Sequence, residues 1–295
     1  FVQWKAANTS ALSIGALLDR PLAEMCEKSR LLDLIRNFII FDNGTKKVPR
    51  QHQFNGVKAA QERIRIREGG VIWHTQGSGK SYSMAFFAEK VRRTVPGNFT
   101  FVLMTDRDDL DSQIYNTFVG CGVADEQTPR ASSGRELQRL LSENHRYVFS
   151  LIHKFNQEVA QDAPYSERDD IIVVSDEAHR TQSGKLARNM RMALPNAAFI
   201  GFTGTPLFKH DQITKRIFGD YVSRYDFKRS EEDGATVKLV YENRGEKLGL
   251  ARLDLNDKIS AAVDAADLDP SPGGVADAAG LRAAGRSLRA GQQHQ

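Results

Sequence analysis

The stretch VIWHTQGSGKS, residues 71–81, joins a short apolar run to a glycine-containing loop, which leads into a Lys-Ser pair and a helical pattern. This order has the parts that a phosphate cradle requires. Gly77 and Gly79 let the backbone turn its N–H groups inward, and a helix that begins near Ser81 adds the positive end of its dipole. The stretch therefore predicts a strand, a phosphate-binding loop and a helix, as in the P-loop.

The side chains that follow the glycines extend this prediction. Lys80 would reach the β- and γ-phosphates of ATP, and the Ser81 hydroxyl would hold Mg²⁺. The usual pattern has glycine at the position of His74. A glycine-rich turn between a strand and a helix, without a nucleotide, is therefore the alternative. The expected cofactor-binding residues of this loop are Gly77, Ser78, Gly79, Lys80 and Ser81.

Short apolar runs alternate with longer mixed segments from about residue 70 to residue 202. The runs are nearly continuous in β-branched and aromatic residues, which is typical of strands buried on both faces. Helical patterns lie between them, for example at residues 81–93 and 135–142. The alternation predicts an α/β fold with a parallel sheet. The expected strands are residues 71–73, 99–104, 147–151, 171–174 and 197–202.

A second chemical segment is IIVVSDEAHR, residues 171–180, in which an apolar strand delivers two adjacent carboxylates at its carboxyl end. Ligands of open α/β sheets bind at that edge. Asp176 is placed to hold Mg²⁺ through water, and Glu177 to orient and deprotonate an attacking water. An ordinary helix N-terminus is the alternative for an isolated Asp-Glu pair.

The flanks of this region read differently. Residues 31–40 form an amphipathic helical stretch that we expect to end near Asn43-Gly44. A basic cluster, Arg63, Arg65 and Arg67, precedes the first strand; we interpret it as a solvated helix face, with a DNA contact as the alternative. A turn is expected near residues 218–221 and a strand at 236–241. Residues 264–295 shift to Ala, Gly, Ser and Arg, which indicates a poorly ordered tail.

Composition excludes several classes of protein. The chain has 295 residues, of which 40% are hydrophobic and 26% charged, so a buried core is expected and global disorder is not. No apolar run approaches the roughly 18 residues of a membrane span, and no basic-then-apolar leader is visible in the sequence, so no secretory signal is expected. Cys26 and Cys121 have no ligand spacing around them, which argues against a disulfide framework or zinc cluster and suits a reducing cytoplasm. A net charge of +4 permits a polyanionic partner.

Together, residues 77–81 and Asp-Glu-Ala-His at 176–179 resemble the motor core of superfamily-two helicases of the DEAH-box type. Residues 202–206, Phe-Thr-Gly-Thr-Pro, look like the segment that links the nucleotide site to the nucleic-acid site in that superfamily. More closely, the chain resembles the motor of the R (restriction) subunit of type I restriction enzymes. That resemblance covers about residues 31–255 and rests on the flanking stretches 50–53, 105–110, 152–155 and 233–237.

The resemblance implies a role for each matching residue. Gln53, with Arg50 nearby, would read adenine, while Lys80, Asp176 and Glu177 would be catalytic. The Mg²⁺ ligands would be Ser81 and Asp176. The residues expected to couple nucleotide state to DNA are His179, Thr203 and Thr205, and those expected to contact DNA are Arg107 and Lys154. Each role has an alternative. Gln53 could be an ordinary surface glutamine and His179 a buried histidine with its hydrogen bonds made. Residues 203–206 could form a simple turn, and Lys154 could be a solvated lysine.

The chain also departs from the restriction subunit. A nuclease domain would carry an Asp/Glu-x-Lys signature ahead of the motor, but the chain has this pattern only at residues 226–228, where we take it as coincidence. No later helicase segment supplies the arginines of a second lobe. We therefore expect a helical approach segment (1–48), a RecA-like ATP-binding domain (49–225), an incomplete second lobe (226–263) and the tail (264–295). Such a piece alone would be nearly inactive as an ATPase.

The expected parent activity is translocation on double-stranded DNA driven by ATP and Mg²⁺, in a cytoplasmic complex with modification and specificity subunits and without a membrane partner. One alternative is another superfamily-two helicase or DNA remodeller. The other is a non-catalytic nucleotide-binding module used for assembly.

Overall fold

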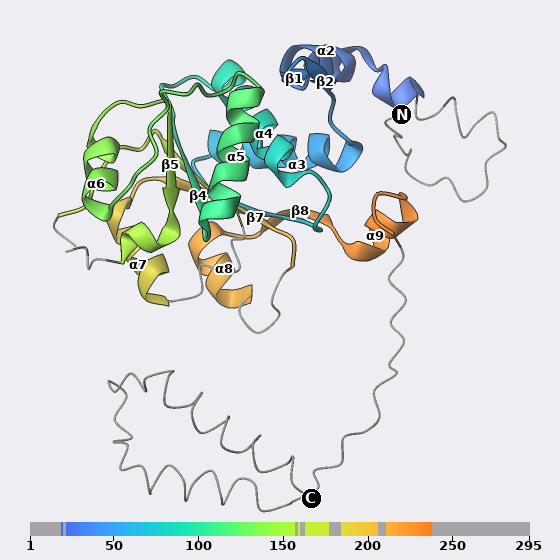
Figure 1. The fold of residues 1–295 in the computed structure, drawn as a ribbon. Helices are drawn as coiled ribbons and strands as arrows, with labels where there is room; N and C mark the ends of the chain where they lie inside the picture. Colours follow the sequence, from blue (N-terminus) through green and yellow to red (C-terminus); the bar gives the residue numbers. More distant parts are fainter. Residues whose placement is uncertain are drawn as a thin grey trace, which may run out of the picture. The chain divides into compact units, whose positions relative to one another are not determined.

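The computed structural model describes residue 19 and residues 22–156, 159, 163–176, 184–205 and 211–237 (Figure 1). The chain divides into two compact units, Phe1–Lys238 and Leu239–Gln295. The second unit, with the expected tail and most of the expected second lobe, lies outside the described residues. The domain boundaries therefore stay predictions.

Six parallel strands form the central sheet of the first unit, in the order β5-β4-β6-β7-β3-β8. All five strands expected from the sequence are present, within a residue or so of the expected ends. A sixth strand, β8, forms one edge where the sequence predicted only a turn. The strands are β3 (Gly70–His74), β4 (Thr100–Thr105), β5 (Tyr147–Leu151), β6 (Ile171–Ser175), β7 (Ala198–Thr203) and β8 (Tyr221–Tyr225).

Helices cover both faces of this sheet (Figure 1). On one face lie α3 (Gln51–Arg65), α4 (Lys80–Thr94) and α5 (Asp108–Gly120). On the other lie α6 (Gly134–Ser142), α7 (Gly184–Ala193) and α8 (Asp211–Phe218). A 3₁₀ turn, η1 (Ile152–Phe155), follows β5, and α9 (Phe227–Glu232) follows β8. The architecture confirms the predicted α/β class.

Alternating residues of the central strands feed two separate cores. In β6, Ile172 and Val174 pack with α3, α4 and α5, whereas Ile171 and Val173 pack with α6, α7 and α8. Because successive side chains of a strand point to opposite faces, a strand covered on both sides must be apolar throughout. This is why the buried strands could be read from the sequence.

The amino-terminal segment corrects one expectation. Helix α2 (Lys28–Asn37) ends before Phe38, and the chain then forms an antiparallel hairpin of β1 (Ile40–Asp42) and β2 (Thr45–Lys47). Asn43 and Gly44 are the two turn residues, with φ of 46° and 80°. Two central residues with positive φ define the tight hairpin turn that Asn-Gly favours. The pair is therefore a hairpin turn and not the helix end that the sequence suggested.

Of the strand predicted at residues 236–241, the structure describes only the first two residues, and these are not in a strand. Thr236 and Val237 lie beyond α9 in irregular structure, and residues 238–241 lie outside the described part of the chain. The predicted turn at 218–221 is present but short: Gly219 has φ of 95°, and β8 begins at Tyr221.

Candidate functional site

The loop of residues 75–79 between β3 and α4, hereafter the β3–α4 loop, has the backbone that the glycines predicted. Gly77 and Gly79 have φ of 80° and 84°, a region that residues with a Cβ adopt only with strain. Gly79 is the N-cap of α4, makes no side-chain cap hydrogen bond, and the first turn of α4 contains no acidic residue. The amino end of α4 thus keeps its backbone donors and its positive dipole for a ligand.

Two buried hydroxyls border this loop. Thr75 Oγ1 and Ser78 Oγ have no hydrogen-bond partner among the described residues. A buried hydroxyl without a partner costs free energy, so such atoms mark a place where a polar ligand or water belongs. The space above Gly77 is open as well, since a Cβ there would meet only the Thr236 methyl at 4.0 Å. The loop therefore fits a phosphate group.

His74 occupies the position where the P-loop pattern has glycine, and the structure shows why this is tolerated. It is the last residue of β3, buried, with Nε2 2.8 Å from Ser223 Oγ of β8. Its φ is not positive, so no glycine is required there. Gly56 of α3 provides the room, because a Cβ on Gly56 would lie 2.9 Å from the His74 ring. Burial lowers the pKa of His74 to about 3, so the ring is neutral near pH 7.

The first turn of α3 supports the loop from the side. Gln53 is buried; its Nε2 donates to the Gly79 carbonyl at 2.9 Å, and its Oε1 accepts from the Arg50 backbone N–H at 2.8 Å. The expected adenine-reading residue therefore lies against the β3–α4 loop. A primary amide has a second N–H and a second lone pair, so contact with a base is compatible with these bonds.

The carboxyl ends of β6 and β7 meet the same edge of the sheet. Asp176 follows β6, is 8% exposed, and its backbone N–H donates to the Met104 carbonyl at 2.8 Å. β7 lies between β6 and β3, so its end separates Asp176 from the β3–α4 loop. Glu177 and His179, expected as the base and a coupling residue, lie outside the described residues.

The expected coupling segment reaches the β3–α4 loop. A Cβ on Gly204 would lie 3.2 Å from Lys80 Nζ and 3.4 Å from the Gln76 backbone nitrogen. Thr203 is buried and its hydroxyl donates to the Thr205 carbonyl at 3.2 Å. The structure therefore brings Lys80 and residues 203–205 together. Gly204 had no predicted role, although it lies inside the Thr-Gly-Thr run; a side chain there would need Lys80 or the backbone of Gln76 to shift by a few tenths of an ångström.

The two expected DNA-contacting residues follow β4 and β5. Arg107 is the N-cap of α5; its side chain is 60% exposed, with Nε 3.7 Å from Asp106 Oδ2. Lys154 of η1 is half-buried and donates to the Ser132 carbonyl at 2.7 Å. Parallel strands present both residues at the same edge as the β3–α4 loop.

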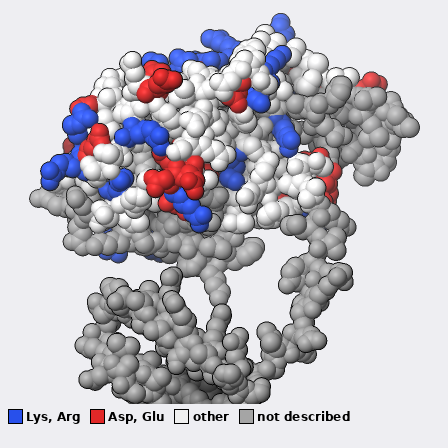
Figure 2. Space-filling model, in the orientation of Figure 1, with Lys and Arg blue, Asp and Glu red and all other residues white. Residues whose placement is uncertain are grey.

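The basic cluster ahead of β3 makes ion pairs within the chain. Arg63 pairs with Glu68 at 2.7 Å, Arg65 with Glu62 at 3.3 Å, and Arg67 with Asp169. On the face drawn in Figure 2, basic and acidic side chains are similarly interspersed. These pairs agree with a solvated helix face.

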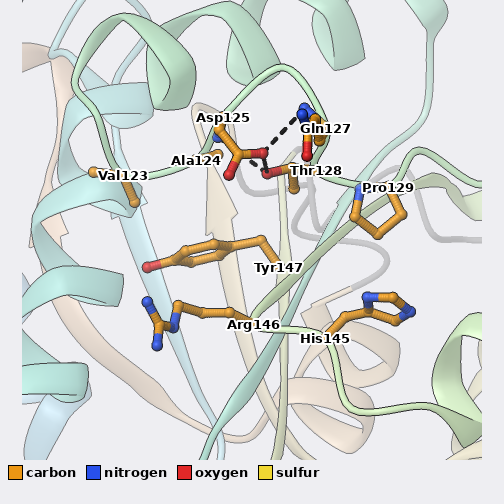
Figure 3. Close-up of a pocket in the computed structure, with 9 residues that line it drawn as sticks. All are labelled: Val123, Ala124, Asp125, Gln127, Thr128, Pro129, His145, Arg146 and Tyr147. Carbon is orange, nitrogen blue, oxygen red and sulfur yellow. Dashed lines mark hydrogen bonds between the residues drawn. The ribbon is translucent and has the colours of Figure 1, made fainter.

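A cavity of about 260 Å³ lies elsewhere, at the start of β5. The loop of residues 123–129 arches over Tyr147 and Arg146, and the Asp125 carboxylate accepts from Thr128 Oγ1 and the Gln127 backbone (Figure 3). Since β5 is parallel to β3, its start is at the opposite edge from the β3–α4 loop. The cavity is therefore separate from the candidate site.

Two properties of the described residues bear on ligands and membranes. In that part of the chain no group of three or more His, Cys, Asp or Glu side chains is arranged to hold a metal ion. Mg²⁺ bound mainly by nucleotide phosphates, with one or two protein ligands, needs no such group. Within the same residues, each helix is too short or too polar to cross a membrane.

Comparison with known proteins agrees with this arrangement. Residues 52–270 match the family model described as SWI2/SNF2 ATPase. The type I restriction enzyme HindI endonuclease subunit of Haemophilus influenzae is 39% identical over 299 residues, which cover 90% of this chain and 28% of that protein. The type I restriction enzyme SsaAORF53P endonuclease subunit of Staphylococcus saprophyticus is 30% identical over 196 residues, 63% of this chain and 21% of that protein.

The chain thus spans about a quarter of the length of the curated relatives it matches. Among solved structures, the UvsW helicase of bacteriophage T4 superposes with a TM-score of 0.51 at 15% identity, over 66% of this chain and 67% of that one. At this identity the likeness shows the fold alone, a RecA-like helicase lobe. The resemblance to type I restriction subunits drawn from the motifs is confirmed.

Proposed function

Because this chain belongs to the SWI2/SNF2 ATPase family, we propose that it binds Mg-ATP in the β3–α4 loop and is the motor lobe of a type I restriction endonuclease subunit. The observation that carries the proposal is the loop itself. Two glycines with positive φ lead into an uncapped helix end, and Lys80 follows directly.

The residues present fit a nucleoside triphosphate. The backbone N–H groups of residues 77 and 79–81 and the buried hydroxyls of Thr75 and Ser78 would supply donors, and Lys80 a cation, while the Ser78 N–H is donated to the Thr75 carbonyl at 3.2 Å. Ser81 and Asp176 would hold Mg²⁺, which when bound neutralises charge on the β- and γ-phosphates. Glu177 would accept a proton from the attacking water. Gly204 lies against Lys80, so a movement of Lys80 when the phosphates change would displace Gly204 and its neighbours Thr203 and Thr205.

In the parent subunit this lobe would couple ATP hydrolysis to translocation on double-stranded DNA, in the cytoplasm and together with modification and specificity subunits. The support is the similarity to type I restriction endonuclease subunits and the position of Arg107 and Lys154 at the edge that carries the loop. Arginines from a second lobe would complete the charge around the γ-phosphate. We therefore expect this chain alone to turn over ATP at close to the background rate.

Calorimetric titration with a non-hydrolysable ATP analogue and Mg²⁺ tests the binding site. Lys80→Ala should weaken affinity by about 100-fold or more, because a positioned cation is lost from the phosphates. Lys58→Ala is the matched control: it removes an exposed lysine of α3 and should leave affinity unchanged. Equal affinity in the wild type and Lys80→Ala would reject the proposed site.

A second substitution separates binding from chemistry. Glu177→Gln should keep affinity and lower turnover of the full-length subunit by about 100-fold, the scale of a lost general base. Unchanged turnover would assign the base to another residue. Nucleotide binding without turnover stimulated by DNA in that full-length subunit would instead favour the assembly module.

A further inference from the structure

We propose that His52 is a positioning residue of the β3–α4 loop: it holds the Ser78 carbonyl and thereby directs the Gly79 N–H toward the bound phosphates. The inference rests on the proposed nucleotide site and adds to it a residue that the sequence analysis left without a role. It concerns how the phosphate cradle keeps its shape.

The contact that carries the proposal is a hydrogen bond to the backbone. His52 Nε2 lies 3.1 Å from the Ser78 carbonyl oxygen. A carbonyl can only accept, so Nε2 must be the protonated ring nitrogen. The neighbouring residue, Gln53, donates to the next carbonyl, that of Gly79. Two successive side chains of α3 thus hold two successive carbonyls of the loop.

The planarity of the peptide bond turns this contact into a directing effect. In a trans peptide the C=O and the following N–H point in opposite directions. When the Ser78 carbonyl points toward His52, the Gly79 N–H must point away from it. The Lys80 N–H is directed in the same way by the Gly79 carbonyl, which accepts from Gln53 and also from the Ser83 N–H of α4. Gly79 has φ of 84° and no Cβ, so its own conformational preference is too weak to hold this orientation.

The His52 ring is fixed by its surroundings. It stacks on Tyr225 of β8 at 3.8 Å with an interplanar angle of 13°, and its edge meets the His74 ring at 5.0 Å. The Tyr225 carbonyl in turn accepts the Thr75 N–H at 2.9 Å. Burial lowers the pKa of His52 to about 4; the hydrogen bond to Ser78 and nearby Asp233 oppose this, while Arg50 and Arg229 add to it. The ring is therefore neutral near pH 7.

Three substitutions separate the hydrogen bond from the packing. His52→Phe keeps the stack on Tyr225 and removes the donor. His52→Gln places an amide N–H at about the reach of Nε2, while His52→Asn is too short for this. Gln61→Leu is the control on the same helix: it removes the bond to Thr94 Oγ1, far from the loop, and should affect only stability.

The measurement is calorimetric titration of each variant of this chain with the ATP analogue and with inorganic tripolyphosphate, both with Mg²⁺, together with thermal unfolding. His52→Phe should weaken both ligands by the same factor, about tenfold, because a loop carbonyl loses its partner and the adjacent N–H its direction. His52→Gln should recover most of that loss and His52→Asn should not.

Several results would overturn the proposal. Equal affinity in the wild type and His52→Phe would do so, as would a loss for ATP without a loss for tripolyphosphate, which would make His52 a base contact. A similar loss of affinity in Gln61→Leu would show that the loss in His52→Phe comes from lower stability and not from the hydrogen bond to Ser78. If His52→Phe does not fold, equal binding by the Gln and Asn variants decides against the proposal. Lys80→Ala serves as the reference, because ATP binding that does not depend on Lys80 would reject the nucleotide site itself.

Discussion

Two connections that follow one another along the chain leave the carboxyl ends of β3 and β4, which are separated in the sheet by β6 and β7, and their helix ends carry opposite charge. The β3–α4 loop ends in Gly79, an N-cap without a side-chain hydrogen bond, and the first turn of α4 contains no acidic residue. The connection from β4 to α5 has no glycine. Its N-cap, Arg107, likewise makes no side-chain cap hydrogen bond, but Asp108, Asp109 and Asp111 lie in the first turn of α5.

The difference shows how one helix end is kept for an anion. The amino end of a helix carries about half a positive charge, which nearby carboxylates neutralise. Three aspartates do so at α5, whereas at α4 Lys80 adds to the positive charge. The absence of acidic residues from the first turn of α4 thus contributes to a phosphate site, together with the two glycines of the loop. Four experiments probe this contrast, taken from the largest expected effect to the smallest.

The first removes a glycine with positive φ, which of these two connections only the β3–α4 loop has. In Gly79→Ala the new Cβ would lie 2.8 Å from Gln53 Nε2 in a residue with φ of 84°. Strain of about 1–2 kcal/mol, together with the displaced amide, should weaken Mg-ATP binding by roughly 10- to 100-fold. Gly122→Ala, at φ of 64° with nothing within 4 Å, is the control and should cost stability only. Equal losses of affinity would contradict the contrast.

The second gives α4 the carboxylate that α5 already has. Ser81→Asp places a negative charge at the second helical position, where α5 has Asp109, and should repel the phosphates. Ser81→Asn has the same shape without the charge. We expect the Asp variant to bind the ATP analogue about tenfold more weakly than the Asn variant in low salt, with the ratio shrinking at high salt. A ratio of one would show that charge at this helix end has no influence.

The third uses acid, since histidines border the β3–α4 loop. His52 and His74 have folded pKa values of about 4 and 3, below the ordinary value of 6.5. Between pH 6.5 and 4 the unfolded chain therefore binds protons that the folded chain excludes, so the free energy of unfolding should decrease as pH falls through this range. Denaturant titrations at several pH values measure this slope. His52→Gln should reduce it by about one proton, and an unchanged slope would be inconsistent with a buried neutral ring.

The fourth and smallest concerns α5. Asp109→Asn removes one favourable charge from the helix end and should lower the free energy of unfolding by about 0.3–1 kcal/mol. Mg-ATP affinity should not change. Chemical denaturation and the same titration measure the two quantities, and a loss of nucleotide affinity would show that the two connections are not independent.

Much of this site could be predicted from the sequence because its parts are local. The buried strand residues, the two glycines and Lys-Ser lie within residues 71–81, so their order can be recognised without knowledge of the fold. The close approach of Gly204 to Lys80 and the stack of His52 on Tyr225 are not local, since they depend on how distant strands pair. β8 was missed because an edge strand with Ser223 and Arg224 lacks the continuous apolar pattern of the central strands. Asn43-Gly44 was misread because the pair serves both helix ends and hairpins.

The pairing of β3 with β8 has a consequence for how the protein is made. Val71 lies opposite Tyr221 and His74 opposite Tyr225, so the strand that opens the β3–α4 loop finds its second neighbour about 150 residues later in the chain. Until that segment leaves the ribosome, β3 has an unpaired edge and the Thr75 amide lacks the Tyr225 carbonyl. Contacts between such distant segments form slowly. The β3–α4 loop would therefore be among the last parts of the protein to reach its folded conformation during synthesis.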